Sequence, residues 1–576
     1  MTDLKKRFQQ YVGIFRGVRI PWIMLLLVLL ISMVESQLFM RQTTLTADII
    51  DGSQQAINTA KLVRFVSVTT AKAGINILIV LLGGWAYQKI NLGVRNKLWN
   101  KLMRLPTKYY DGESGDALVS RVTTDASQSY IYFRVVMELL TAVYAAVVAY
   151  RQMVKFSPVL SRYILLLIPV LLIMAWLFGK LNFIAGRKGQ TTFSKTLGYL
   201  VEMTRNLRLV KAARMEFREQ QRGKAFFHKQ FRASLWAIFS NSSSVLLIEL
   251  LSCAATAITF ILGRGLVADG EISVGKLLGF YTISSMMIVQ IIQLLTLYGA
   301  LKQGNGQMEK IAQILDAPEE KQEGIEFDVG DQDIVVEHID FAYGDRPVLK
   351  DVGFTIPKGK VTAIIGSNGA GKSTMFKLLE RMYDPDEGRI RFGQTDAKEF
   401  DIHSWRESFA IVSQDKPLLS GTVRDNILYG TRRRVSEEEL VRVAKQANVY
   451  DFVMDTPGGF DAQVGMGGGN FSGGQRQCIA IARAMMRNPD YLLLDEATCN
   501  MDVYAEKQVT EALMRLMAGR TTVMISHDMR MLDRADQVVV LGGGTVEAAL
   551  PREEAIAVSP TLQKLIAAEA GKGDNT

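Results

Sequence analysis

A glycine-rich loop that ends in a lysine is the first feature of this sequence that indicates chemistry. Residues 361–365 are apolar and β-branched, residues 366–371 contain three glycines, and residues 375–379 have helical spacing. Strand, glycine loop and helix form the context of a phosphate-binding loop, in which backbone N–H groups and a helix N-terminus surround an anion. We therefore expect a nucleotide site at Gly366, Ser367, Asn368, Gly369, Ala370, Gly371, Lys372, Ser373 and Thr374.

Two carboxylates downstream extend this prediction to hydrolysis. Asp495 and Glu496 end an apolar run over 491–494 that has the character of a buried strand. Asp495 is placed to bind Mg²⁺ together with the Ser373 hydroxyl, and Glu496 to polarise an attacking water. Lys372 is expected to reach the β- and γ-phosphates. These groups predict cleavage of a nucleoside triphosphate.

A further segment with free backbone donors precedes a helical run over 478–486. It consists of Ser472, Gly473, Gly474 and Gln475. Taken alone, such a segment is an ordinary turn. Because it lies between the phosphate loop and the two carboxylates, we expect its N–H groups to contact phosphate as well.

The composition indicates a membrane protein with a large soluble part. The chain has 576 residues, of which 48% are hydrophobic and 22% charged, and its mean hydropathy is +0.11. The net charge of +9 comes from basic residues between apolar runs, as the positive-inside rule predicts, so no nucleic-acid partner is expected. The three cysteines are widely spaced and predict neither a disulfide framework nor a metal site.

Six apolar runs are long enough to cross a bilayer as helices. They cover about 21–39, 63–88, 132–150, 160–178, 245–262 and 274–297. Six spans place both termini on one side, and the basic segments 91–127 and 180–232 mark that side as cytoplasmic. Helical spacing within 180–232 predicts extended helices. Residues 40–61 are expected to form a polar external loop and residues 302–330 a charged linker.

After residue 334 the sequence changes to short β-rich runs with glycine turns. The predicted fold is therefore a multidomain membrane protein. An N-terminal all-α transmembrane domain of six helices occupies residues 1–320. A C-terminal α/β P-loop ATPase domain follows over 321–568, and residues 569–576 form a polar tail.

Together, the motifs and the layout resemble an ATP-binding cassette (ABC) transporter, and more closely a bacterial half-transporter of the exporter type. Segments 104–121 and 202–219 resemble the two cytoplasmic loops of such exporters. The resemblance implies ATP and Mg²⁺ as cofactors, and a multi-pass protein of the bacterial inner membrane with its nucleotide-binding domain and both termini in the cytoplasm. It also implies a second half-transporter as partner. An identical chain is favoured because all catalytic groups are present, although a heterodimer is compatible with the sequence.

Four single residues match family positions. Tyr343 corresponds to the aromatic that stacks on adenine and Gln414 to the glutamine that touches Mg²⁺. Asp502 corresponds to the aspartate that links the two nucleotide sites, and His527 to the switch histidine that contacts the γ-phosphate.

The sequence also departs from the family pattern at three places. Phe471 stands where the family usually has Leu, and Cys499, Asn500 and Met501 replace its common Ser-Ala-Leu. Met466 occupies the position at which exporters usually carry a Glu that contacts the cytoplasmic loops. None of these changes removes a catalytic group.

The resemblance implies an ATP-driven exporter that moves an amphipathic peptide, lipid or drug out of the cytoplasm by alternating access. The phosphate loop of one chain and the Ser472 segment of another would enclose the same ATP. An importer built on the same layout, of the siderophore-uptake type, is the alternative. A soluble ATPase of nucleic-acid maintenance conflicts with the six spans, and a regulator or gated channel conflicts with the presence of Glu496 and His527.

Ionisable residues inside apolar runs are costly and tend to be functional or paired. Glu35 and Lys72 fall at similar depth in the first two runs, so we expect an ion pair between them, unless both face external water. Glu138 and Glu249 have no evident partner in the sequence and are weaker candidates for contact with a cationic substrate group.

Overall fold

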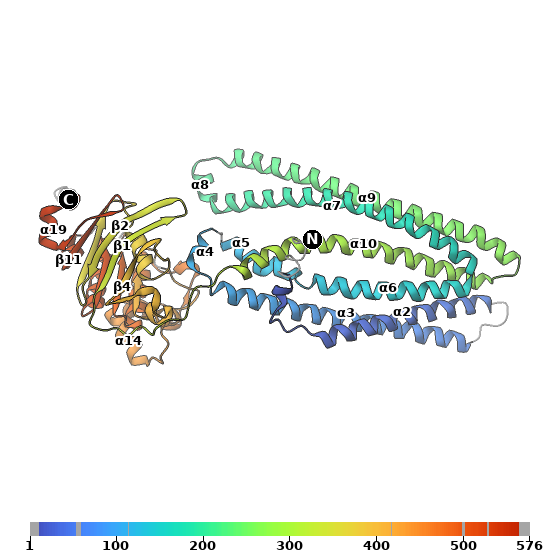
Figure 1. The fold of residues 1–576 in the computed structure, drawn as a ribbon, viewed down its shortest axis with the longest axis horizontal. Helices are drawn as coiled ribbons and strands as arrows, with labels where there is room; N and C mark the ends of the chain where they lie inside the picture. The colour runs from blue at the N-terminus through green and yellow to red at the C-terminus, as the bar shows by residue number, and fades with distance from the viewer. Residues whose placement is uncertain are drawn as a thin grey trace. The chain divides into compact units, whose positions relative to one another are not determined.

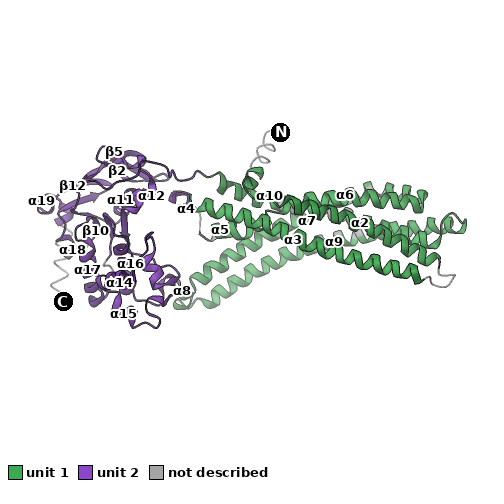
Figure 2. Cartoon of the chain, turned by 90° about the horizontal axis from the view of Figure 1, so that it is seen from below, with its two compact units in different colours: residues 1–104, 113–317 green, residues 105–112, 318–576 purple. Residues whose placement is uncertain are grey.

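The computed structural model describes residues 11–52, 59–112, 115–415, 417–497, 501–526 and 529–563. The chain forms two compact units, which Figure 2 shows in different colours. Unit 1 comprises residues 1–104 and 113–317, and unit 2 comprises residues 105–112 and 318–576. Unit 1 is helical, whereas unit 2 contains the β-sheets.

In the part of the chain that the structure describes, unit 1 contains six long helices, and each of the six predicted apolar runs coincides with one of them to within a residue. These helices are α2 (Trp22–Asp51), α3 (Thr59–Leu102), α6 (Ile131–Phe156), α7 (Pro158–Arg205), α9 (Glu216–Ala268) and α10 (Val274–Asp316). Short helical segments connect them: α5 (Gly115–Ser120), a π-helical turn (Arg121–Asp125), a 3₁₀ turn (Ala126–Gln128) and α8 (Leu207–Ala212). Within the described residues, stretches long and apolar enough to cross a membrane occur in Trp22–Asp51, Thr59–Leu102 and Ala117–Phe156.

The prediction of extended helices over 180–232 is confirmed, because α7 and α9 continue as helices and meet through the short helix α8. Figure 1 shows α7 and α9 lying side by side and α8 at the tip that joins them. The remaining long helices pack around one another, with α2 against α3, α6 and α10.

Two boundaries predicted in unit 1 are wrong. The external loop does not begin at residue 40, because α2 continues to Asp51. The hydroxyls of Thr43 and Thr44 donate to carbonyls one turn back, so these polar residues are satisfied inside the helix. The linker does not begin at residue 302 either, since α10 continues to Asp316 and buries Met308, Ile311 and Ile314.

The ion pair expected between Glu35 and Lys72 does not form. Glu35 accepts a hydrogen bond from Asn76 Nδ2 at 3.2 Å, and Lys72 Nζ lies 4.5 Å from the centroid of the Phe39 ring. Glu138, in contrast, has a partner that the sequence analysis missed. Arg134 Nε donates to Glu138 Oε1 at 2.6 Å from one turn earlier on α6.

Unit 2 contains two main sheets. A mixed sheet has the strand order β12-β11-β3-β10-β9-β6. Its parallel strands are β3 (Val361–Gly366), β6 (Phe409–Val412), β9 (Tyr491–Asp495), β10 (Thr521–Ile525) and β11 (Gln537–Gly542). Its antiparallel strand is β12 (Thr545–Pro551). An antiparallel sheet has the order β2-β1-β4-β5, formed by β1 (Ile334–Tyr343), β2 (Arg346–Ile356), β4 (Glu387–Phe392) and β5 (Thr395–Asp396). A small pair joins β7 (Gly421–Thr422) to β8 (Gln463–Val464).

The described residues of unit 2 also form helices, with members packed on each face of the mixed sheet. They are α4 (Thr107–Asp111), α11 (Lys372–Leu379), α12 (Ile402–Glu407), α13 (Val423–Leu428), α14 (Glu437–Gln446), α15 (Tyr450–Met454), α16 (Gly473–Arg487), α17 (Val503–Met517), α18 (Met529–Leu532) and α19 (Arg552–Val558). Along β9, Leu492 and Leu494 pack in an apolar cluster with residues of α16 and α17, while Leu493 packs in another with residues of β1 and α11. Burial on both faces explains the continuous apolar run of this strand.

In unit 1, the end of α2 is tied to the start of α10. The Asp51 carboxylate accepts hydrogen bonds from the Gly275 N–H, at 2.7 Å, and from the Ser273 hydroxyl. A Cβ atom at Gly275 would lie 2.2 Å from the Ala47 carbonyl oxygen. The two helices therefore approach closely enough here to require glycine.

Gly275→Ala is expected to lower the thermal stability of the full chain, because overpacking typically costs about 1–3 kcal/mol. Gly265→Ala on α9 is the matched control, since a Cβ there meets nothing within 4 Å and alanine favours the helix. The measurement is thermal unfolding of both variants in lipid nanodiscs. Equal melting temperatures for the two variants would contradict the close approach.

Candidate active site

The candidate active site lies where neighbouring parallel strands end. In the order β3-β10-β9-β6, the carboxyl ends of four adjacent strands lie along one edge of the sheet. The phosphate loop follows β3, Asp495 and Glu496 end β9, and Gln414 follows β6. His527 follows β10 in the sequence but lies outside the described residues, as do Cys499 and Asn500. Such an edge is where open α/β sheets bind ligands.

The phosphate loop contains glycines with a left-handed backbone, and at Gly371 there is no room for a side chain. Gly369 and Gly371 have φ values of 84° and 100°, and a Cβ at Gly371 would lie 2.4 Å from Leu349 Cδ2. Lys372 begins α11 and its side chain folds across the loop, where Nζ donates to the carbonyl oxygens of Gly366, at 2.7 Å, and Ser367, at 3.1 Å. Burial lowers the pKa of Lys372, and the nearby carboxylates of Glu496 and Asp495 oppose that shift.

Ser373 and Asp495, predicted to share a metal ion, are brought together by the fold. The Ser373 hydroxyl hydrogen-bonds Asp495, and burial together with the neighbouring Glu496 carboxylate raises the pKa of Asp495. A hydroxyl, a carboxylate and the amide of Gln414 are the oxygen ligands that suit Mg²⁺. Among the described residues, no cluster of three or more His, Cys, Asp or Glu could hold a metal. The donor set therefore fits Mg²⁺ that also takes oxygens from substrate phosphates.

Glu496 occupies an unusual backbone conformation. Its φ is +45°, and its N–H donates to the Ile525 carbonyl of β10 at 3.0 Å. The backbone thus leaves β9 abruptly at this residue, and the side chain is only partly buried. A residue held in this region stores strain, which is common at functional positions.

The segment from Ser472 to Gln475 forms the N-terminus of α16. Ser472 Oγ accepts from the Gln475 N–H, and Gln475 Oε1 accepts from the Ser472 N–H at 2.9 Å. Asp502 caps α17 in the same manner by accepting from the Ala505 N–H at 3.0 Å. The sequence analysis overlooked these capping contacts, although Ser-x-x-Gln before a helix is their signature. Both side chains therefore hold helix ends whose N–H groups are suited to anions.

Tyr343 belongs to an aromatic cluster at the end of β1. Its ring meets Phe341 and Tyr383 edge to face, with centroid distances of 4.9 and 5.5 Å. The cluster lines a cavity of about 820 Å³ together with residues of α4. The Tyr383 hydroxyl donates to the Asp111 carboxylate. Tyr383 and Asp111 are site residues that the sequence analysis did not identify, because their pairing joins segments far apart in the chain.

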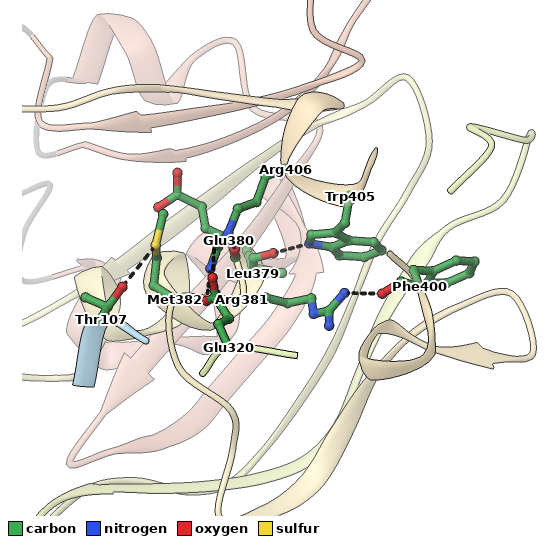
Figure 3. Close-up of polar contacts among 9 residues, drawn as sticks. All are labelled: Thr107, Glu320, Leu379, Glu380, Arg381, Met382, Phe400, Trp405 and Arg406. Carbon is green, nitrogen blue, oxygen red and sulfur yellow. Dashed lines mark hydrogen bonds and ion pairs between the residues drawn. The ribbon is translucent and has the colours of Figure 1, made fainter. Parts of the chain in front are cut away.

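The C-terminal end of α11 is held by side chains of α12, as Figure 3 shows. Trp405 Nε1 donates to the Leu379 carbonyl at 2.8 Å, and Arg406 donates to the carbonyls of Glu380 and Arg381. The same Arg406 guanidinium binds the Glu320 carboxylate at 2.6 and 3.0 Å. Figure 3 also shows the Thr107 hydroxyl of α4 directed at the Met382 sulfur, at 3.4 Å.

The structure describes the backbone at two of the three places where the sequence departs from the family pattern. Phe471 is buried and packs against Phe452 with a centroid distance of 6.1 Å. The larger side chain is therefore accommodated. Met466 begins a 3₁₀ turn that ends at Gly468.

This fold and site define a P-loop ATPase unit joined to a helical membrane unit in one chain. The model of the ABC transporter transmembrane region matches residues 22–291, and the ABC transporter model matches residues 349–499. The chain belongs to the ABC transporter family, and its ATPase unit is of the kind that hydrolyses ATP.

Relatives match this chain over most of its length. An ATP-dependent lipid A-core flippase of Methylobacillus flagellatus is 31% identical, covering 84% of this chain and 82% of the relative. The protein of that name in Syntrophus aciditrophicus is 30% identical over 82% and 80%. A multidrug resistance ABC transporter ATP-binding and permease protein of Lactococcus lactis is 25% identical over 99% and 97%.

Tyr343→Ala is expected to weaken ATP binding by a term on the order of 1 kcal/mol, because a stacked aromatic pair contributes that much. Tyr343→Trp retains a stacking face and should be mild by comparison. The measurement is equilibrium binding of a fluorescent ATP analogue to the full chain. Equal affinity in the wild type and Tyr343→Ala would show that the ring serves packing alone.

The stability of unit 2 should depend on pH through Glu380. Burial raises the pKa of Glu380 from its ordinary 4.5 to about 7, against the lowering effect of Arg406 and Arg487. Because the folded state binds this proton more tightly than the unfolded state, stability falls as pH rises from about 4.5 to about 7, by up to about 3 kcal/mol.

Glu380→Gln should flatten this pH dependence. The measurement is the melting temperature of the ATP-free chain between pH 5 and pH 7.5 in nanodiscs. Glu387→Gln, at an exposed position on β4, is the control and should retain the wild-type slope. A slope unchanged by Glu380→Gln would show that this carboxyl is ionised throughout.

Proposed function

We propose that this chain is one half of an ATP-driven exporter that moves an amphipathic drug, lipid or peptide out of the cytoplasm by alternating access. The observation that carries the proposal is the meeting of Lys372, Ser373, Asp495 and Glu496 at one sheet edge, in a chain that also holds six long helices. The relatives described above are named as a multidrug resistance transporter and as flippases, and none of them as an importer.

In this proposal each residue of the site has a distinct role. Lys372 binds the β- and γ-phosphates when it exchanges the loop carbonyls for phosphate oxygens. Ser373, Asp495 and Gln414 hold Mg²⁺, which neutralises developing charge on the phosphates. Glu496 orients and polarises the attacking water, and His527 contacts the γ-phosphate. Tyr343 stacks on adenine.

A second half-transporter completes the functional transporter, and an identical chain is sufficient for this. The N-terminus of α16 from one chain would face the phosphate loop of the other, with Asp502 linking the two nucleotide sites. The tip formed by α8 supports a partner, because Leu209 and Phe217 there are 66% and 73% exposed. Large exposed apolar side chains that cluster in this way mark interaction surfaces. A related but different chain is the alternative partner.

The contacts around α11 provide a route by which nucleotide state reaches the membrane helices. Its N-terminal end carries the phosphate loop, and beyond its C-terminal end Met382 contacts Thr107, while Arg406 binds Glu320. Residues 105–112 continue from α3 in the chain, and Glu320 follows α10. Movement of α11 on binding ATP would therefore act on both chain segments that lead to unit 1.

The proposed location is the bacterial inner membrane, with unit 2 and both termini in the cytoplasm. The basic segments 91–127 and 180–232 support this orientation. The sequence retains all the catalytic groups that the family resemblance implies, which favours a transporter that turns over ATP over a regulator or gated channel.

Glu496→Gln is expected to retain ATP binding and to lose hydrolysis by at least about 100-fold, because a general base or water-orienting group contributes that much. Glu438→Gln, exposed on α14, should hydrolyse ATP at the wild-type rate. The measurements are phosphate release and ATP-dependent uptake of Hoechst 33342 into inside-out vesicles. Near-normal turnover in Glu496→Gln would reject the assignment of the base. Uptake that requires right-side-out vesicles would reverse the direction of transport.

A further inference from the structure

Unit 1 contains a cavity of about 730 Å³ among α2, α3, α6 and α10. Its lining contains both apolar and polar residues. Val28, Ile79 and Leu297 provide apolar surface, whereas Tyr87, Arg134 and Glu138 provide polar groups. Both kinds of surface in one cavity suit a ligand with a polar head and an apolar tail.

The polar lining of this cavity includes a neutral charge pair. Arg134 and Glu138 bind each other at 2.6 Å, yet their side chains remain 44% and 41% exposed. Beside them, the rings of Tyr87 and Tyr130 are stacked with centroids 5.0 Å apart. Ionisable residues on membrane-spanning helices commonly mark a ligand path. This pair is part of neither the ATP site nor the packed core of unit 1.

We infer that this cavity binds the head group of a zwitterionic amphiphile, an inference that rests on the proposed export function and names its substrate class. A head with a single charge would be attracted by one member of the pair and repelled by the other, one helical turn away. A zwitterion can exchange the Arg134–Glu138 bond for two bonds of its own. The tyrosine faces favour its cationic end, and the apolar wall accommodates its chain.

Glycines on α3 keep the cavity open. A Cβ at Gly84 meets nothing within 4 Å, and one at Gly83 makes only ordinary contact with Tyr87 and Val28. Gly84 therefore has room for a Cβ atom at the cavity, and we expect a large side chain there to reduce the cavity volume. Gly74 on the same helix also faces open space but does not line the cavity, so it offers a matched control.

The test is photolabelling of the full chain in phosphatidylglycerol nanodiscs, a bilayer that supplies no zwitterionic heads. The probe is a lysophosphatidylcholine with a diazirine in its tail, and the labelled residues are mapped by mass spectrometry. Labelling of α3 and α6 should fall about tenfold in Gly84→Phe, equivalent to about 1.4 kcal/mol of binding, and persist in Gly74→Phe. Equal labelling in both variants would overturn the inference.

Competition between the probe and unlabelled amphiphiles tests which head group the cavity prefers. Sub-micellar dodecylphosphocholine should displace the probe at about tenfold lower concentration than dodecyltrimethylammonium or dodecyl maltoside. Glu138→Gln, which removes the negative charge beside Arg134, should lose that preference. Equal competition by the three heads would show an unspecific apolar cavity and reject the zwitterionic class.

Because labelling requires neither ATP nor transport, the amphiphile site and the exporter function can each be rejected independently of the other. Specific labelling in a chain that exports no amphiphile would retain the site and reject the exporter. ATP-driven dye export without specific labelling would retain the exporter and reject the site.

Discussion

Unit 2 depends on hydrogen bonds that satisfy the carbonyl groups at the C-terminal end of α11. A helix leaves its last carbonyls without partners inside the helix, and α11 has only eight residues. From α12, Trp405 supplies a partner for the last of these carbonyls, that of Leu379, and Arg406 binds the carbonyls of Glu380 and Arg381 that follow. Because α11 carries the phosphate loop at its other end, the same bonds that complete a short helix also fix the loop. The guanidinium that serves two of these carbonyls also binds Glu320, so the helix end and the incoming chain are held by one group.

The order of the parallel strands provides the second constraint. Since β10 lies between β3 and β9, the segments that follow these strands meet at one edge although they are far apart in the sequence. Buried on both faces, the strands contain mainly apolar and no charged residues until they end. Charged groups such as Asp495 can therefore appear only at the strand ends, which form the edge proposed to bind the nucleotide.

Local patterns were sufficient to predict much of this architecture. The apolar runs predicted six long helices because a membrane helix must be apolar over a fixed length, and the β-branched run over 361–365 predicted β3. The helix boundaries were less predictable. On α2, threonine hydroxyls donate to backbone carbonyls of the same helix, so polar residues do not end it. On α10, buried apolar side chains extend the helix into a charged segment that had been predicted as a linker.

Contacts between distant residues were the least predictable. The similar depth of Glu35 and Lys72 in their apolar runs did not identify the partner of Glu35, because Asn76 is the residue that hydrogen-bonds it. Tyr383 and Asp111 meet only once the chain is folded. The local Arg134–Glu138 pair, in contrast, has the i,i+4 spacing of helix ion pairs, which offered a signal in the sequence.

The backbone of Glu496 has an evolutionary consequence. A non-glycine residue at a φ of +45° costs of order 1–3 kcal/mol, and glycine would adopt the same conformation with little strain. The most stable residue at this position is thus one that cannot polarise water. Under the proposed function, mutation to glycine would give a better-folded but inactive transporter, and selection for turnover would maintain the strained glutamate. The end of β9 is a place where stability and activity are traded against each other.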